Sequence, residues 1–375
     1  VIVGRGILDN NLNVSNALID MYAKCGLFED AKGVFEKLPV RDIVSWNALV
    51  TGYTKQGHSH EALACFDQMR LGKVIPDVVT FICVIKSCGS ICAIEKGCNI
   101  HDEVNKRGLL KEAISADIGN ALIAMYASCG NLRKAEEVFD QLPSQDVVLW
   151  NVLITGYVEH GYGEEALQSF GMMQASMVSP TSITFVCTLK ACSCTGTTRK
   201  GKAIHAEIMR DNTFETNLFI GSALVDMYGK FGELAKAQRV FDELQSRNIV
   251  CWNALISGYV QYGCSEEALN CFQQMQSEGI SPNAVTYACI LKSCASLGAA
   301  EKGKEIHAEI LRGGLLGKDI ILGNALMDMY GKFHAVLKVQ EVFDQHHLRD
   351  AVTWNILISG YCQQGHGIEA LSCFA

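Results

Sequence analysis

The chain repeats itself at a long and nearly constant interval. The pattern Trp-Asn-x-Leu-aliphatic accounts for every Trp of the sequence, namely Trp46, Trp150, Trp252 and Trp354. These residues are separated by 104, 102 and 102 positions. Two other motifs recur at matching intervals. Their first copies are "NALIDMYAKCG" at 16–26 and "IEKGCNIH" at 94–101. Self-similarity at a fixed interval is typical of arrays of stacked structural units, so it limits the fold more than any other feature.

Each interval divides into three units, which we call short, middle and long. Short units have 31 residues, complete middle units have 35, and long units have 36 or 38. Residues 1–11 are expected to be the end of a preceding long unit. The short units are 12–42, 116–146, 218–248 and 320–350; the middle units are 43–77, 147–181, 249–283 and the incomplete 351–375; the long units are 78–115, 182–217 and 284–319.

Each unit is predicted to form two α-helices. In the first middle unit, apolar residues follow the spacing i, i+3, i+4, i+7 of an amphipathic helix, at Trp46, Leu49, Val50 and Tyr53. Ser265 is expected to cap the second helix of a later middle unit. One helix pair cannot bury its apolar face alone, whereas stacked pairs share a continuous core. The predicted fold is therefore all-α, an α-solenoid superhelix of stacked helix-turn-helix repeats.

Composition supports a folded chain in a reducing environment. The 375 residues are 49% hydrophobic and 19% charged, which is typical of globular rather than disordered proteins. The 17 Cys lie in apolar runs such as "CVIKSC" at 83–88, where free Cys behaves as a small buried hydrophobe. No run of eighteen apolar residues predicts a membrane span. Because the sequence begins with Val1 and ends in mid-pattern at Ala375, we interpret it as a fragment, without a visible targeting peptide.

Polar residues recur at two places of the short and middle units. The fifth place holds Asn16, Asn47, Asn120, Asn151, Ser222, Asn253, Asn324 and Asn355. The last place holds Asp42, Asp77, Asp146, Thr181, Asn248, Asn283 and Asp350. The long units instead have apolar residues at the fifth place, namely Ile82, Val186 and Ala288. Two interpretations stay open: local capping of helix ends, or a paired polar row that forms a recognition surface along one face.

The motifs resemble those of a known family. The stretch "VSWNALVTGYTKQGHSHEALACFDQMR" at 44–70 resembles the plant pentatricopeptide repeat. The motifs "NALIDMYAKCG" and "GKEIHAEI" are also typical of that family, and the resemblance covers eleven units over 12–375. The alternation of unit lengths resembles its PLS subclass, in which the long, short and 35-residue units are named L, S and P.

The resemblance implies that each unit binds one base of single-stranded RNA. In the family, the fifth and last residues together select the base. Asn with Asp favours uracil, Asn with Asn favours cytosine and then uracil, and Ser with Asn favours adenine. Asn offers both a donor and an acceptor, which match the N3–H and O4 of uracil. Carried over to this sequence, the code predicts the target U-U-n-U-Y-n-A-C-n-U, read 5′ to 3′ along the chain, where the long units accept any base and Asn151 with Thr181 accepts a pyrimidine.

The resemblance also assigns a role to the second residue of each unit. In the family, bases are held between the second residues of consecutive units. The middle units carry Val at this place, at Val44, Val148, Val250 and Val352. These residues suit base stacking and a plain hydrophobic core equally well.

Other chemistry finds little support in the sequence. The "HAE" of 205–207 and 307–309 resembles the H-x-E of zinc deaminases, but no C-x-x-C accompanies it. Cys88 with Cys92, and Cys192 with Cys194, lack the further ligands of a zinc site. We therefore expect no catalytic residue, metal or cofactor and no enzyme in this chain. A basic group in the long units is interpreted either as a solvated helix face or as a stripe that follows RNA phosphates: Lys96, Arg199, Lys200, Lys202, Lys302 and Lys304.

The expected function is sequence-specific RNA binding in plant mitochondria or chloroplasts, where the repeats guide cytidine-to-uridine editing. The expected partners are single-stranded organellar RNA and an editing deaminase or other editing factors, but no membrane; the deaminase domain would lie beyond Ala375 or act in trans. One alternative is a factor for transcript stabilisation or splicing without editing. Another is a protein-binding helical-repeat scaffold, which the net charge of −8 favours slightly and the Asn row opposes.

Overall fold

The computed structural model describes residues 12–111, 115–210, 217–317 and 319–374. These residues form twenty-two α-helices and one short 3₁₀-helix (Leu109–Lys111), without any strand among them. The prediction of an all-α fold is therefore confirmed. The long-unit end expected at 1–11 lies outside the described residues. Residue contacts divide the chain into two compact parts, on either side of the bond between Ala191 and Cys192, and we describe each part by itself.

The first part contains ten helices and the beginning of an eleventh. They are α1 (Leu12–Lys24), α2 (Phe28–Glu36), α3 (Ile43–Lys55), α4 (Ser59–Leu71), α5 (Val78–Ser90), α6 (Ile94–Lys106), α7 (Ser115–Ser128), α8 (Leu132–Gln141), α9 (Val147–Glu159), α10 (Gly163–Ala175) and α11 (Ser182–Thr195). Odd-numbered helices are the first helices of the predicted units, and even-numbered helices are the second.

The second part follows the same order of helices. They are α12 (Thr198–Arg210), α13 (Leu218–Lys230), α14 (Leu234–Glu243), α15 (Ile249–Gln261), α16 (Ser265–Ser277), α17 (Ala284–Leu297), α18 (Ala300–Arg312), α19 (Ile320–Lys332), α20 (Val336–Gln345), α21 (Ala351–Gln363) and α22 (Gly367–Phe374).

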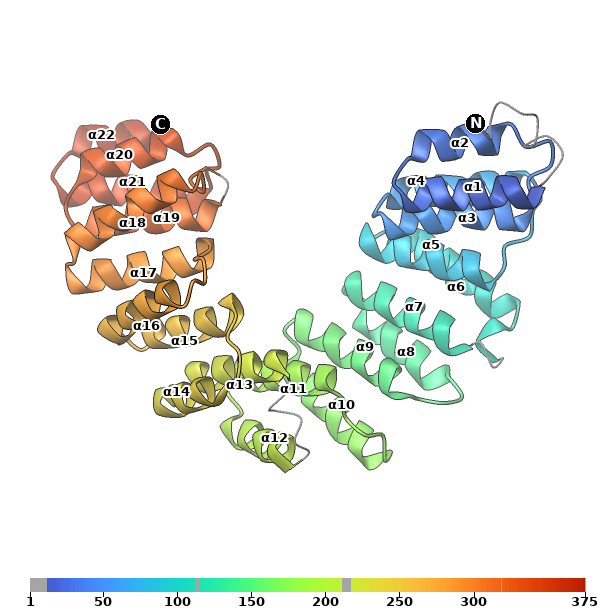
Figure 1. Cartoon of the computed structure of the whole chain (residues 1–375), viewed down its shortest axis with the longest axis horizontal. Coiled ribbons are helices and arrows are strands. Elements are labelled where there is room, and N and C mark those ends of the chain that lie inside the picture. The colour runs from blue at the N-terminus through green and yellow to red at the C-terminus, as the bar shows by residue number, and fades with distance from the viewer. Residues whose placement is uncertain (1–11, 112–114, 211–216, 318, 375) are drawn as a thin grey trace. The chain divides into compact units, whose positions relative to one another are not determined.

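Within each part the helices stack as an α-solenoid. Consecutive first helices pack side by side, so α3 contacts both α1 and α5, and α15 contacts both α13 and α17. The second helices form the other layer and pack against the first helices of their own units, as α4 contacts α3 and α16 contacts α15 (Figure 1). This arrangement confirms the predicted stacking of helix-turn-helix repeats and puts equivalent residues of successive first helices next to each other.

The last residue of most short and middle units is the N-cap of the next first helix. Asp42 is the N-cap of α3, and its side chain accepts a hydrogen bond from the backbone N–H of Ser45 at 2.9 Å. Similar caps precede α5, α9, α15, α17 and α21, at Asp77, Asp146, Asn248, Asn283 and Asp350. These last residues therefore cap helix ends, which leaves their predicted part in base recognition open. The cap expected at Ser265 is wrong, because α16 already begins at that residue and follows Cys264, whose side chain makes no capping hydrogen bond.

The Trp of each repeated motif packs between units. Trp150 and Trp252 are 2% and 0% exposed. Each ring meets a Phe of the preceding second helix edge-on, with 4.5 Å between ring centroids for Phe139 and Trp150 and for Phe241 and Trp252. Edge-to-face pairs add to the stabilisation that burial gives. Trp354 keeps its Phe343 partner but is 37% exposed.

A Gly recurs in the second helix of each long unit, in the motif first seen as "IEKGCNIH" at 94–101. It allows two helices to approach closely. A Cβ added to Gly303 of α18 would lie 2.5 Å from Sδ of Met329 in α19, and equivalent contacts occur at Gly97 and Gly201. We expect Gly303→Ala to lower the free energy of unfolding by about 1–3 kcal/mol, because Met329 must move within a packed interface.

Gly331 provides the matched control for this prediction. It is also helical, but no atom lies within 4 Å of an added Cβ. Ala there should be neutral or stabilising by about 0.5–1 kcal/mol, since Ala favours the helix over Gly. Urea unfolding of both variants measures the difference. Equal destabilisation, or none for Gly303→Ala, would show that the α18–α19 contact does not require Gly.

Most cysteines and the H-x-E histidines are at least partly buried. The 17 cysteines are thiols rather than disulfides, and burial raises the pKa of Cys88 and Cys294 to about 11. His307 Nδ1 lies 2.8 Å from the Tyr330 hydroxyl, and burial lowers the pKa of this His below its ordinary value. In the part of the chain that the structure describes, no three His, Cys, Asp or Glu side chains are placed to hold a metal ion. None of the described helices combines the length and apolar character that crossing a membrane requires.

Candidate nucleic-acid interface

The fifth residue of a unit lies beside the last residue of the same unit. The last residue caps the next first helix, and that helix packs against the first helix of the preceding unit, so the two side chains meet. Asn47 Nδ2 donates to both carboxylate oxygens of Asp77 at 3.0 Å. The same bond joins Asn16 to Asp42 at 3.3 Å and Asn324 to Asp350 at 3.4 Å. The stacking of helices thus pairs residues that are far apart in the sequence.

Two further pairs have neutral partners. Asn151 Nδ2 donates to Thr181 Oγ1 at 3.0 Å. Asn253 Nδ2 donates to Asn283 Oδ1 at 3.2 Å. Five of the seven predicted pairs are therefore joined by a side-chain hydrogen bond, although the last residue of each pair differs in charge and chemistry.

The other two pairs are not joined among the described residues. The Ser222 hydroxyl donates to the backbone oxygen of Leu218 at 2.7 Å and lies 3.0 Å from Cys251 Sγ. Ser222 thus caps no helix end, and its role in base recognition stays a prediction. Asn120 lies on α7 without a hydrogen bond to Asp146, whose side chain caps α9. Asn355 is exposed on α21, in the unit that the sequence leaves incomplete.

Hydrogen bonds lower the pKa of two carboxylates of the pairs, those of Asp42 and Asp350. Burial alone would raise the pKa of Asp42, but hydrogen bonds from Ser45 and Asn16 lower it overall. Hydrogen bonds from the backbone and side chain of Thr353 lower the pKa of Asp350. A carboxylate accepts hydrogen bonds only, so it fixes the neighbouring amide with its N–H₂ group towards the acid.

The second residues of the units are exposed. Val44, Val148, Val250 and Val352 are between 50% and 55% exposed, so the core interpretation of these residues is wrong. Equivalent residues in other units, which the sequence interpretation had not singled out, are also exposed and apolar: Val79, Ile183, Phe219, Val285 and Ile321. Their shared second place in a unit is the signal that identifies them. Each lies one helical turn before a fifth residue.

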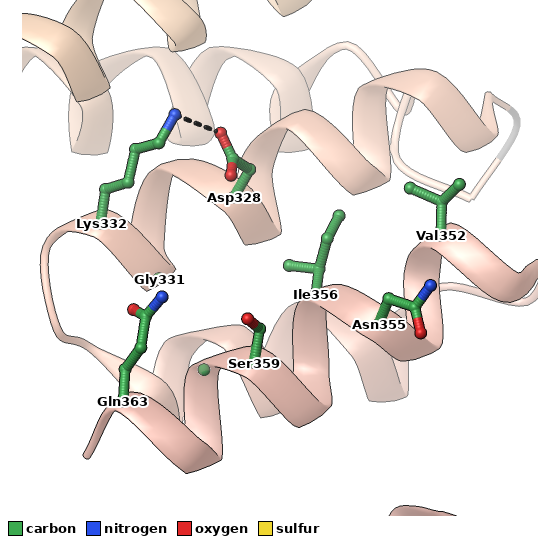
Figure 2. A pocket seen from close by; sticks show the side chains of 9 residues that line it. Asp328, Gly331, Lys332, Val352, Asn355, Ile356, Ser359 and Gln363 are labelled. Carbon is green, nitrogen blue, oxygen red and sulfur yellow. Dashed lines mark hydrogen bonds and ion pairs between the residues drawn. The ribbon is translucent and has the colours of Figure 1, made fainter.

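Open hollows lie between neighbouring first helices. Figure 2 shows one of about 340 Å³ between α19 and α21, where Val352, Asn355 and Ile356 come from α21 and Lys332 comes from α19. In another, α1 and α3 bring together Asn16, Val44 and Asn47. A third, next to α7, α9 and α11, is lined by Val148, Asn151 and Ile183 among others. Fifth and second residues therefore line the same hollows, although Asn16 and Asn151 are only 6% and 8% exposed there.

Basic side chains occur on both layers. On the first helices, Lys24, Lys230 and Lys332 pair with Asp20, Asp226 and Asp328 at 2.6, 2.8 and 2.8 Å. The predicted basic group lies instead on the second helices α6, α12 and α18, away from the fifth residues. Several of its members pair with acidic side chains: Lys96 with Asp67, Lys202 with Glu233, Lys302 with Glu305 and Lys304 with Glu301.

Family models match most of these units. A model described as PPR repeat family matches residues 41–90, 145–194 and 247–296, and a model described as PPR repeat matches 14–43, 120–147, 222–249 and 352–375. Together the matches cover more than half of the chain. The chain belongs to the pentatricopeptide repeat family. The resemblance expected from the motifs "WNALV" and "NALIDMYAKCG" is thereby confirmed at the level of the family.

Relatives and solved structures agree with this membership. A chloroplastic pentatricopeptide repeat-containing protein of Arabidopsis thaliana is 32% identical over 96% of this chain and 41% of its own length. A mitochondrial one from the same plant is 33% identical over 96% of this chain and 52% of its own length. The chain spans about half the length of such relatives. The crystal structure of the pentatricopeptide repeat protein PPR10 from maize covers 100% of this chain and 59% of that one, at 22% identity and a TM-score of 0.71, which supports the fold.

Proposed function

We propose that this pentatricopeptide repeat chain binds single-stranded RNA sequence-specifically, with one base for each unit. The observation that carries the proposal is the row of five hydrogen-bonded pairs of fifth and last residues beside open hollows, as in Asn47 with Asp77. A paired carboxamide is oriented, yet it keeps one N–H and one oxygen lone pair for a ligand. These two groups match the O4 and N3–H of uracil.

The proposed target is U-U-n-U-Y-n-A-C-n-U. Each base would lie between exposed second residues of consecutive units, such as Val44 and Val79, which offer apolar contact to any base. At the long units the fifth residues Ile82, Val186 and Ala288 cannot hydrogen-bond a base edge, so these units accept every base. Lys332 lies beside Asn355 and Val352, and its ammonium group would contact the RNA backbone by leaving or sharing its ion pair with Asp328.

Known relatives favour an organellar role. A structure similar in fold, at 19% identity and a TM-score of 0.75, is PPR10 in complex with an 18-nt PSAJ RNA element. Two relatives are named chloroplastic and mitochondrial. We assign the chain to the PLS subclass on its unit lengths, and we propose that it selects sites for cytidine-to-uridine editing, with the deaminase elsewhere in a longer protein or supplied in trans.

Competition between homopolymers tests RNA binding directly. A fluorescent RNA with the proposed sequence is bound to the protein, and unlabelled poly(U) or poly(A) is added. Since at least four of the seven assigned bases are uracil and only one is adenine, poly(U) should displace the probe at concentrations about tenfold lower than poly(A). Equal displacement would remove the base assignments. No binding of the probe at low salt would leave a protein-binding scaffold as the function.

A further inference from the structure

We propose that Thr80, Thr184 and Thr286 are positioning residues for base recognition by the three complete middle units. This inference rests on the proposed function. Each Thr is the third residue of a long unit and is fully buried, at 0% exposure. Each Thr lies in the unit after the one that carries the base-reading Asn. It would therefore influence recognition of the base that is assigned to the preceding unit.

The Thr hydroxyl holds the amide oxygen of the preceding middle unit. Oγ1 of Thr80 donates to Asn47 Oδ1 at 2.6 Å, and Thr286 donates to Asn253 Oδ1 at the same distance. Thr184 donates to Asn151 Oδ1 at 2.5 Å. A hydroxyl has one hydrogen, and the alternative acceptor of Thr80, Asp77 Oδ1, is farther away at 2.9 Å. The hydrogen therefore serves the amide.

The amide is consequently held from both sides. Its Nδ2 donates to the last residue of its own unit, and its Oδ1 accepts from the Thr of the next unit. Rotating the amide of Asn47 by half a turn would place its oxygen against the Asp77 carboxylate, so two acceptors would face each other and the contact with Asp77 would be lost. The observed orientation is therefore the favoured one. One N–H and one oxygen lone pair of the amide remain free, each with a fixed direction. Because both are already oriented, the conformational entropy cost of orienting them when a base binds is avoided.

The short units lack this second contact. Ser45 and Thr353 occupy the same third place, but their hydroxyls donate to their own cap residues, Asp42 at 2.6 Å and Asp350 at 2.8 Å. The amide oxygens of Asn16, Asn120 and Asn324 are buried without a hydrogen-bond partner. The geometry therefore predicts sharper base discrimination by the middle units than by the short units.

The test replaces Thr80 by Val, which keeps the shape and removes the donor. Affinities are measured for the proposed RNA and for versions with cytosine at the first or second nucleotide. We expect the wild-type protein to prefer uracil over cytosine at the second nucleotide by about tenfold. In Thr80→Val this ratio should fall to about threefold or less, while the ratio at the first nucleotide, read by Asn16, stays unchanged. Thr80→Ser keeps the hydroxyl and should restore the ratio.

Thr353→Val is the matched control, since it removes the same kind of cap hydroxyl from α21 without an amide contact. Its uracil preference at the tenth nucleotide, read by Asn324, should not change. A wild-type protein without preference at the second nucleotide would refute the proposed function itself. A preference that survives unchanged in folded Thr80→Val would overturn only the positioning role. If Thr80→Val does not fold, Thr286→Val takes its place, and the base preference is measured at the eighth nucleotide. The same outcomes then support or overturn the positioning role.

Discussion

Replacing Asn47 by Ser and Asp77 by Asn in one protein should change the preferred second nucleotide from uracil to adenine. The double variant copies the fifth and last residues of the short unit that carries Ser222 and Asn248. Wild-type protein should prefer uracil over adenine at this nucleotide by about 10- to 100-fold, the range for loss of a bidentate base contact. The double variant should reverse the preference, as measured by binding to RNAs that differ only there.

Asp77→Asn alone is the control for this exchange. Asn is as good an N-cap as Asp, so α5 should keep its stability. The single variant copies the middle unit of Asn253 and Asn283, so its preference should move from uracil towards cytosine without reaching adenine. An unchanged uracil preference in both variants would show that the fifth and last residues do not select the base.

Trp252→Ala should lower the free energy of unfolding by about 3–5 kcal/mol. The Trp252 side chain is fully buried between α14 and the core of its own unit, and its ring meets Phe241 at 4.5 Å. Removing it leaves a cavity where two units meet. In a solenoid the contacts between neighbouring units supply much of the stability, so the damage should spread to unfolding of the adjacent units.

Trp354→Ala provides the comparison at an equivalent place. Its Phe343 contact has almost the same geometry, with 4.7 Å between centroids, but the side chain is 37% exposed. Its loss should cost about 1–2 kcal/mol, because less apolar surface returns to water. The midpoints of urea unfolding, followed by helical circular dichroism, measure both effects. Similar midpoints for the two variants would contradict the role of Trp in packing between units.

The sequence predicted the helices because their signal is local. The spacing of Trp46, Leu49, Val50 and Tyr53 predicted one buried face, and all four side chains are buried in α3. The repeat interval then predicted that the same face would recur and that the units would stack. The family resemblance placed fifth and last residues together, and five pairs are joined in the structure.

Other features of the site depend on distances between units, which a sequence does not contain. The hydrogen bond from Thr80 to Asn47 joins residues 33 positions apart. It requires a particular shift of α3 along α5. Ser45 stands at the same place of its unit but does not reach Asn16, and nothing in the two residue types predicts this difference. Likewise, the Ser222 hydroxyl bonds to a backbone oxygen of its own helix rather than to Asn248.

The most direct test of base reading by the amide row is a single-nucleotide scan of the RNA U-U-n-U-Y-n-A-C-n-U. Each nucleotide is exchanged in turn, pyrimidine for purine or purine for pyrimidine, and the affinity is measured at constant salt. We predict losses of about 5- to 100-fold at the nucleotides assigned to short and middle units. The third, sixth and ninth nucleotides, opposite Ile82, Val186 and Ala288, should tolerate every base. Losses that do not follow this period of three, or no losses at all, would contradict the assignment.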